Sequence, residues 1–151
     1  ELLDVARALP DVRFQVLGWG PDEDKLRRCA LPNLEFAGFE RGERFRQRFA
    51  RARIFFLPSR AEGFPLVLLY AMASGCAVIG TLPLPFEGAH IPPGDTDRMV
   101  EAVRRLWTNR DETARMGLAN WQRAQRYTWE RYTDLLLATY REILEERGAK
   151  S

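Results

Sequence analysis

Two kinds of apolar pattern alternate along the first half of the chain. In one, apolar residues recur every three or four positions, as on one face of a helix; in the other, short runs of β-branched and aromatic residues fit buried strands. These patterns predict helices at residues 2–9, 22–29, 41–52 and 65–74 and strands at residues 12–17, 34–39, 54–57 and 76–80. The alternation favours an α/β fold, a three-layer Rossmann-like domain whose parallel sheet has right-handed crossovers and helices on both faces.

The pattern changes after Thr81. The prolines of Leu82–Pro85 exclude a central strand and predict a loop, and His90–Ile91 fits a last strand remnant. Helical spacing then predicts three further helices, at residues 95–107, 111–126 and 128–143. We expect these C-terminal helices to pack back over the sheet and the four tryptophans to serve as packing aromatics, so that residues 1–151 form a single domain.

Composition narrows the function classes. The chain has 151 residues, of which 46% are hydrophobic, and its formal net charge of +2 shows no basic footprint for nucleic acid. The arginine-rich stretch at residues 41–53 is interpreted as a solvated helix face, with an anionic partner as the alternative. Two cysteines without zinc spacing predict neither a disulfide framework nor a metal site, and favour a reducing, cytoplasmic location. The chain begins within a helix and without Met, so we expect it to be part of a longer polypeptide.

The most informative segment is Pro58–Gly75, where a polar turn leads from a strand into an apolar helix. Gly63 permits a tight turn, Pro65 suits the first helical position, and Gly75 stands where a C-terminal cap belongs. Such connections lie at the carboxyl end of parallel strands, where backbone amides and the helix dipole favour an anion. Glu62 is therefore placed at the mouth of a candidate ligand site, although an acid at this position can also be a simple helix cap.

A series of segments carries a family resemblance over nearly the whole chain: LPDVRFQVLGWGP, PNLEFAGF, ARARIFFLPSRAEGFPLVLLYAMASGCAVIGT, IPPGD and YTWERY. In this order and spacing, they resemble the donor-binding C-terminal domain of the family-four retaining glycosyltransferases, one half of a GT-B fold. The resemblance implies sugar transfer from a UDP- or GDP-linked sugar with retention and no required metal or other cofactor. It also implies an N-terminal acceptor domain outside this sequence, without which the fragment is expected to be inactive, and peripheral membrane association only through such absent parts.

The resemblance also implies roles for individual residues. Glu62, the acidic residue of the turn, would be the catalytic residue and would contact the donor sugar near the reacting centre. The backbone amides of Gly63 and Phe64 would approach the sugar and the diphosphate. The remaining donor-binding residues would be Pro65 and Leu66 at the helix start, Gly38 and Phe39 near the base, Gly18 and Gly20 in a neighbouring loop, and Arg60. Ordinary turn chemistry is the alternative for the glycines, and a solvent-facing side chain is the alternative for Arg60.

Three departures from the family pattern weaken this site. Tyr70 occupies the position of the second acid of the paired-glutamate motif, which normally grips the ribose. It is expected either to keep a residual ribose contact or to serve simply in helix packing. The family's first strand, with its Arg and Lys, would precede Glu1. The glycine-rich loop is reduced to residues 82–91, where His90 is more readily structural than catalytic.

These observations leave two principal hypotheses and a weaker third. The first is the nucleotide-sugar domain of a retaining glycosyltransferase. The second, favoured by Tyr70 and the short loop, is a degenerate glycosyltransferase-like domain that serves as an interaction or scaffold module. The third is a non-transferase, nucleotide-binding α/β domain of flavodoxin type, which a close superposition on GT-B structures would exclude.

Overall fold

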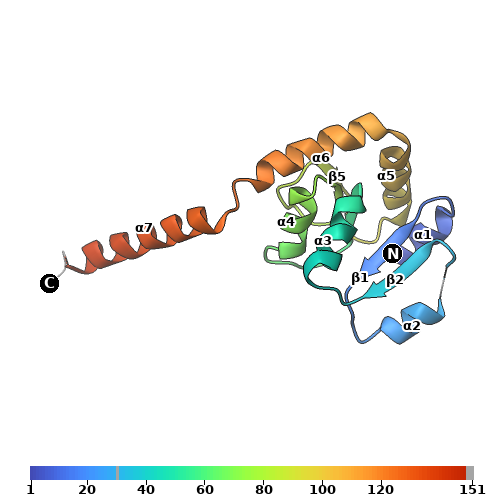
Figure 1. Ribbon diagram of the computed structural model, residues 1–151, viewed down its shortest axis with the longest axis horizontal. Helices are drawn as coiled ribbons and strands as arrows, with labels where there is room; N and C mark the ends of the chain where they lie inside the picture. Colours follow the sequence, from blue (N-terminus) through green and yellow to red (C-terminus); the bar gives the residue numbers. More distant parts are fainter. Residues whose placement is uncertain (30, 149–151) are drawn as a thin grey trace.

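The computed structural model describes residues 1–29 and 31–148 as a layered α/β domain from which one long helix projects (Figure 1). The strands are β1 (Phe14–Leu17), β2 (Leu34–Gly38), β3 (Ile54–Leu57), β4 (Ala77–Gly80) and β5 (Gly88–His90). The helices are α1 (Leu2–Ala8), α2 (Glu23–Arg28), α3 (Gly42–Arg51), α4 (Leu66–Ala73), α5 (Thr96–Thr108), α6 (Arg110–Ala124) and α7 (Trp129–Gly148). Every predicted element is present, and the strand remnant at residues 90–91 is found as β5.

All the strand pairs are parallel, as predicted, but the strands form two sheets instead of one. β1 pairs with β2, and β3 pairs with β4, which in turn pairs with β5. Within the described residues, no backbone pairing joins β1 to β3. The expectation of a single sheet is corrected in this respect, although both sheets contribute to the same cores.

Helices cover both faces of β4, whose residues are all buried. On one face, Ala77 and Ile79 belong to a cluster with residues of α1 and α5; on the other, Val78 packs with Leu68 and Met72 of α4. Successive side chains of a strand point to opposite faces, so β4 serves two cores at once. This position explains why the strand predicted at residues 76–80 is a short, continuous apolar run.

α4 ends in a close junction with α6. Gly75 has φ +74°, the Gly75 amide donates to the Met72 carbonyl at 3.0 Å, and the Cys76 amide donates to the Ala71 carbonyl at 3.0 Å. This is the Schellman pattern, which confirms Gly75 as the cap. A Cβ on Gly117 of α6 would overlap the carbonyl oxygen of Gly75, so the two helices approach more closely than any side chain would allow.

The basic stretch around α3 is exposed, as predicted, and part of it is ion-paired. Arg48 donates to Glu35 of β2 at 2.9 Å and to Glu40 at 3.1 Å. Hydrogen bonds from Gln15 and Arg48 lower the pKa of the Glu35 carboxyl. These contacts attach α3 to the β1–β2 sheet.

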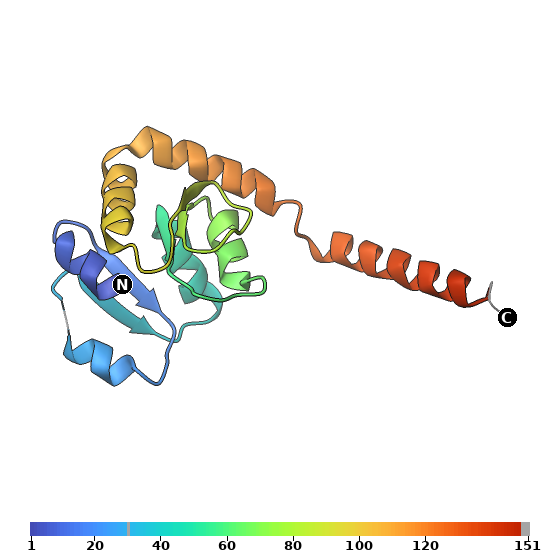
Figure 2. The same ribbon diagram turned by 180° about the vertical axis from the view of Figure 1, so that it is seen from behind.

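The C-terminal helices differ from one another in how they pack. α5 and α6 lie against the sheet, as expected, whereas α7 extends away from the domain in both views (Figures 1 and 2). Trp129, Tyr132 and Tyr140 are exposed along it. The expectation that the last helix packs back over the sheet is therefore wrong, since the apolar stripe of α7 meets no surface of the described chain.

The packing role expected of the tryptophans holds for one of them. Trp107 is partly buried beneath Arg53, whose guanidinium lies 4.4 Å from its ring centroid. Trp19, Trp121 and Trp129 are exposed. No helix in the described part of the chain is long and apolar enough to cross a membrane.

The Gly75–Gly117 contact predicts an unusual response to substitution. Gly→Ala inside a helix normally adds about 0.5–1 kcal/mol of stability, but at Gly117 the methyl group would force α6 away from α4. We expect Gly117→Ala to lower the free energy of unfolding by about 1–3 kcal/mol, as overpacked sites do, measured by urea denaturation. Leu118→Ala, at an exposed position next to it, should change it by less than about 0.5 kcal/mol. A stabilised Gly117→Ala variant would contradict the close contact.

Candidate functional site at the carboxyl edge of the sheets

The loops that follow the parallel strands gather at one edge, called here the carboxyl edge. In the β3–β4–β5 sheet this edge carries the Pro58–Glu62 turn, Thr81 and Ile91. In the β1–β2 sheet it carries Gly18, whose amide donates to the Gly38 carbonyl at 2.8 Å. α1 runs back along β1, so its first residue lies at the carboxyl end of β1, and Glu1 there pairs with Arg60 of the turn at 3.6 Å. The two sheets therefore bring their carboxyl ends to the same side of the domain.

Glu62 is exposed in this turn and its carboxylate is held by a neighbour. The Ser59 hydroxyl donates to Glu62 Oε1 at 2.9 Å. The Ser59 carbonyl in turn accepts from the Thr81 hydroxyl, at the end of β4. The carboxylate is thus tied through Ser59 to the end of the buried central strand, while the Glu62 residue as a whole stays exposed.

The start of α4 follows Glu62 directly. Pro65 is the N-cap with ψ 116°, and helical residues begin at Leu66, one position later than predicted. The first amides of a helix have no partner within it, so the N-terminus of α4 presents donors and the positive end of its dipole at the carboxyl edge. Gly63 has an ordinary, negative φ with open space around it, so the turn itself does not require glycine there.

Tyr70 packs between two helices. Its ring meets the Phe45 ring edge-on at 5.1 Å and lies 6.4 Å from the Phe49 ring, both on α3. It is still 52% exposed. Of the two expected roles, packing against the adjacent helix is found in the structure, and this leaves one side of the ring open.

Of the other predicted donor-binding residues, Phe39, Arg60, Phe64 and Leu66 are exposed, whereas the three glycines Gly18, Gly20 and Gly38 are half-buried and Pro65 is buried. Phe39 follows β2 and carries the Arg41 guanidinium 4.8 Å from its ring centroid. Phe64 stacks on Tyr127 at 5.4 Å, and Leu66 is largely uncovered. Arg60 is 82% exposed apart from its ion pair with Glu1. Gly20, in the loop before α2, is half-buried with open space around its Cα.

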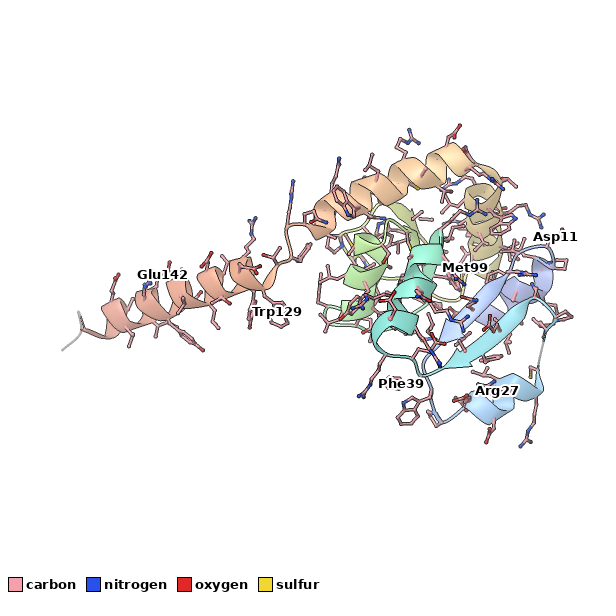
Figure 3. All side chains as sticks on the ribbon, in the orientation of Figure 1. Asp11, Arg27, Phe39, Met99, Trp129 and Glu142 are labelled. Atoms are coloured by element: carbon pink, nitrogen blue, oxygen red, sulfur yellow. The ribbon has the colours of Figure 1, made fainter. Side chains whose placement is uncertain are left out.

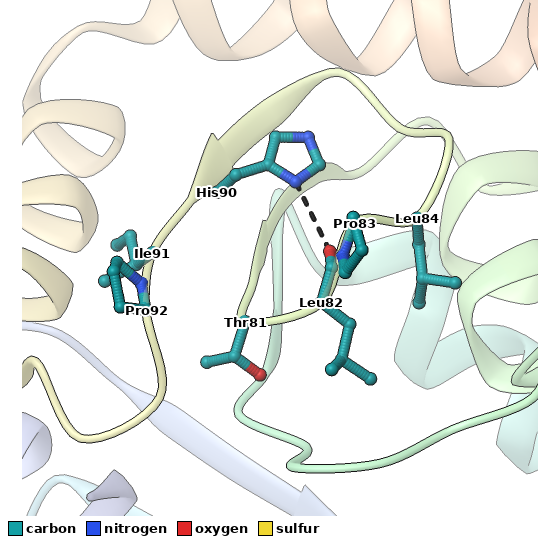
Figure 4. Close-up of a pocket in the computed structure, with 7 residues that line it drawn as sticks. All are labelled: Thr81, Leu82, Pro83, Leu84, His90, Ile91 and Pro92. Atoms are coloured by element: carbon teal, nitrogen blue, oxygen red, sulfur yellow. Dashed lines mark hydrogen bonds between the residues drawn. The ribbon is translucent and has the colours of Figure 1, made fainter.

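A hollow of about 530 Å³ lies at the carboxyl ends of β4 and β5 (Figure 4). It occupies the place of the predicted short loop and is lined by Thr81, Leu82, Pro83, Leu84, His90, Ile91 and Pro92. His90 stacks on Phe86 at 4.0 Å, and its Nδ1 lies 3.4 Å from the Leu82 carbonyl oxygen. Glu62 does not line this hollow, and the contacts of His90 are those of a residue that shapes the loop.

Sequence reasoning missed the residues that hold this edge in place. Asn120 of α6 is fully buried; its side chain donates to the Cys76 carbonyl and to the Glu87 carbonyl, both at 2.8 Å, and accepts from the Glu87 amide at 2.7 Å. It thereby fixes the short loop against β4. Ser59 was also missed, although a hydroxyl three residues before an acid is a recognisable capping pair. No local signal marks an asparagine whose partners are 33 and 44 residues away.

Potential metal ligands do not gather here. Among residues 1–29 and 31–148, no group of three or more His, Cys, Asp or Glu side chains is placed to hold a metal ion. Cys76 is buried and burial raises the pKa of its thiol to about 11, which makes it a packing residue.

Known structures share this arrangement of sheets and loops. Sucrose-phosphate synthase from Thermosynechococcus elongatus superposes with a TM-score of 0.78 at 20% identity, over 96% of this chain and 42% of that one. HepE from Anabaena, in a complex with UDP-glucose, superposes with a TM-score of 0.76 at 17% identity, over 92% of this chain and 44% of that one. The fold is that of the GT-B glycosyltransferases, so a flavodoxin-type domain is excluded.

Sequence comparison identifies the family. The family model "Glycosyl transferases group 1" matches residues 2–109. Sulfoquinovosyl transferase SQD2 of Arabidopsis thaliana is 30% identical over 145 residues, which cover 87% of this chain and 28% of that protein. The chain belongs to the group 1 glycosyl transferases, and it spans less than a third of the length of this relative.

The packing of Tyr70 can be tested without a ligand. Tyr70→Ala removes the ring contacts with α3, so we expect a loss of about 1–2 kcal/mol in the free energy of unfolding, whereas Tyr70→Phe should change it by less than about 0.5 kcal/mol. Tyr132→Ala is the matched control, since this tyrosine is 57% exposed and meets the Trp129 ring of its own helix edge-on. Equal effects of Tyr70→Ala and Tyr132→Ala in thermal or urea unfolding would show that the α3 contact contributes nothing.

Proposed function

We propose that this chain is the donor-binding part of a retaining, cytoplasmic glycosyltransferase that takes its sugar from a UDP- or GDP-linked donor. The observation that carries the proposal is the Glu62 carboxylate, oriented by Ser59 directly before the N-terminus of α4. Membership in the group 1 family supports sugar transfer, and the UDP-glucose bound to the Anabaena protein supports a nucleotide-sugar donor.

The chemistry of the turn suits this donor. A carboxylate accepts hydrogen bonds from sugar hydroxyls, and such charge-assisted bonds are stronger than neutral ones. The amides of Gly63 and Phe64 and the dipole of α4 favour a diphosphate beside the sugar. One turn therefore contacts both sides of the bond that breaks.

In the proposed reaction, the bond between the sugar anomeric carbon and the diphosphate oxygen breaks, and the electron pair leaves with the diphosphate. The acceptor hydroxyl attacks the anomeric carbon from the face that the diphosphate leaves, and its proton passes to a departing phosphate oxygen. Donors at a helix start stabilise the charge that develops on the leaving group. Retention then follows from holding acceptor and leaving group on one face, with no metal and no covalent sugar intermediate.

Under this proposal, sugar transfer also needs an acceptor-binding domain in addition to the described residues. The acceptor is assigned to a second domain of the GT-B fold, outside this chain, and any association with a membrane surface is assigned to those parts. The fragment alone is expected to bind donor and not to transfer sugar.

Donor binding can be measured by calorimetric or NMR titration of the chain with UDP, GDP and the corresponding glucose-linked forms. We expect binding at millimolar ligand or better, and we expect Glu62→Gln to weaken the sugar-linked forms by about tenfold or more, as the loss of a charged hydrogen bond does. Bare UDP and GDP should be affected much less, because the proposal assigns Glu62 to the sugar and not to the nucleotide.

Glu142→Gln provides the control for this titration, since Glu142 is exposed on α7, far from the carboxyl edge (Figure 3). It should leave all affinities unchanged. An absence of binding for every ligand at millimolar concentration would reject donor recognition. Equal losses for bare nucleotides and nucleotide sugars in Glu62→Gln would reject the sugar contact.

A degenerate, non-catalytic scaffold is the second candidate, and the position of Tyr70 favours it. The phenol packs on α3 where an acid would grip the ribose. A phenol offers a ribose diol one oxygen where a carboxylate offers two, so nucleotide affinity is expected to be reduced by about 10- to 100-fold.

Tyr70→Glu separates the two candidates. If the site is a weakened donor site, this variant should bind UDP or GDP about 10- to 100-fold more tightly in the same titration. Tyr70→Gln removes the ring equally but carries no charge, so it should show little of that gain. A Tyr70→Glu variant that is folded by circular dichroism and gains no affinity would favour the scaffold.

A further inference from the structure

Side chains, and not backbone hydrogen bonds, hold the segment between Glu62 and α4 in the described structure. Glu62 accepts from Ser59, and the Phe64 ring stacks on the Tyr127 ring, with centroids 5.4 Å apart and planes inclined at 33°. Among residues 1–29 and 31–148, no backbone carbonyl accepts from the amides of Gly63 and Phe64. A Cβ added to Gly63 would meet no atom within 4 Å. The conformation of this segment therefore depends on the two side-chain contacts at its ends.

The backbone of Phe64 lies where the proposed function places the diphosphate. Its amide and that of Gly63 are the two donors assigned to the donor substrate. The next residue, Pro65, is the N-cap of α4 and carries no amide hydrogen. The amides of Gly63 and Phe64 are thus the last donors before the helix itself, and their direction follows the fold of residues 62–64.

Tyr127 belongs to a part of the chain that is anchored on α4. Its amide donates to the Ala124 carbonyl at 3.0 Å, at the end of α6. Ala124 is buried in a cluster with Leu68 of α4. The next residue, Thr128, accepts from the Arg131 amide at 3.2 Å and caps α7. The Tyr127 ring is therefore presented from a fixed helix end, although α7 itself extends away from the domain (Figures 1 and 2).

The exposure of the two rings indicates what their contact does. Phe64 is 42% exposed and Tyr127 is 44% exposed. Apolar stabilisation is roughly proportional to the area removed from water, so two half-exposed rings add less to the fold than a core pair does. Their contact does restrict the turn. A site that is ordered before its ligand arrives binds more tightly, because binding does not have to order it.

We propose that Tyr127 is a positioning residue for donor binding, whose ring holds Phe64 so that the amides of Gly63 and Phe64 point toward the diphosphate. The inference rests on the proposed function for its ligand. It adds a residue from the junction of α6 and α7 to a site otherwise built from the loops that follow the strands. Tyr127 does not touch the donor, and its effect passes through the Phe64 ring. The phenol oxygen has no part in this contact, so the ring alone is needed.

The first measurement needs no donor. NMR relaxation of the whole chain gives the order parameters of the Gly63 and Phe64 amides, which we expect near the rigid value of about 0.85. Tyr127→Ala should lower both to about 0.6 or less. Phe64→Ala removes the other ring and should lower the value at Gly63 in the same way. Tyr127→Phe keeps the ring and should keep the order. Tyr132→Ala, at a 57% exposed tyrosine of α7, is the control and should change neither amide.

The second measurement is the titration with UDP-glucose and GDP-glucose. We expect Tyr127→Ala to weaken the donor that binds by about three- to tenfold, the factor by which the competent turn becomes less populated. Tyr127→Phe should restore the affinity to within about twofold. The double variant of Tyr127→Ala and Phe64→Ala should bind no more weakly than the weaker single variant, because both changes remove one contact. Circular dichroism establishes that each variant is folded.

Several results would overturn the proposal. These are low order parameters in the unmodified chain, unchanged values in folded Tyr127→Ala, and an equal fall in Tyr132→Ala. A fall in order without a loss of affinity would also overturn it. So would a Tyr127→Phe variant that behaves like Tyr127→Ala, because the hydroxyl would then matter and not the ring. If the unmodified chain binds no donor, the proposed function is rejected and the role in donor binding with it, whereas the order parameters still decide whether Tyr127 holds the turn.

Discussion

The burial of β4 on both faces is the constraint on which the rest of the structure depends. Its residues 77–80 contact α1 and α5 through one set of side chains and α4 and α6 through the other. A strand enclosed in this way fixes the register of β3 and β5 beside it. It thereby fixes where β3 and β5 end and where the loops that follow them begin. The position of the carboxyl edge is therefore a consequence of this central strand.

Asn120 and Gly117 transmit that constraint to the candidate site. Gly117 lets α6 approach the end of α4, and Asn120 satisfies the backbone of the short loop that leads to β5. Both act on the C-terminal end of α4, opposite the end where Glu62 lies. α4 is therefore held at one terminus by buried contacts and presents the other terminus at the edge, with Ser59 orienting the carboxylate there.

Sequence patterns predicted the local features of this arrangement well. Alternating helix and strand periods defined all the elements, and glycine chemistry identified the cap at Gly75, because both depend on neighbours in the chain. The interruption between β1 and β3, the outward path of α7 and the partners of Asn120 depend on contacts between distant segments. A periodic apolar stripe, such as that of α7, predicts that a helix has a partner but not which surface provides it.

Tyr70 shows why residue identity alone left the site undecided. α4 is apolar on all sides, and Leu66 and Tyr70 form an exposed stripe that starts one turn after Glu62. A helix without a polar face is stable in water when something covers it. Phe45 covers one side of Tyr70, which ties the ring to the fold. The remaining exposed surface of Leu66 and Tyr70 continues from the turn that holds Glu62, so the apolar stripe of α4 lies beside the candidate site.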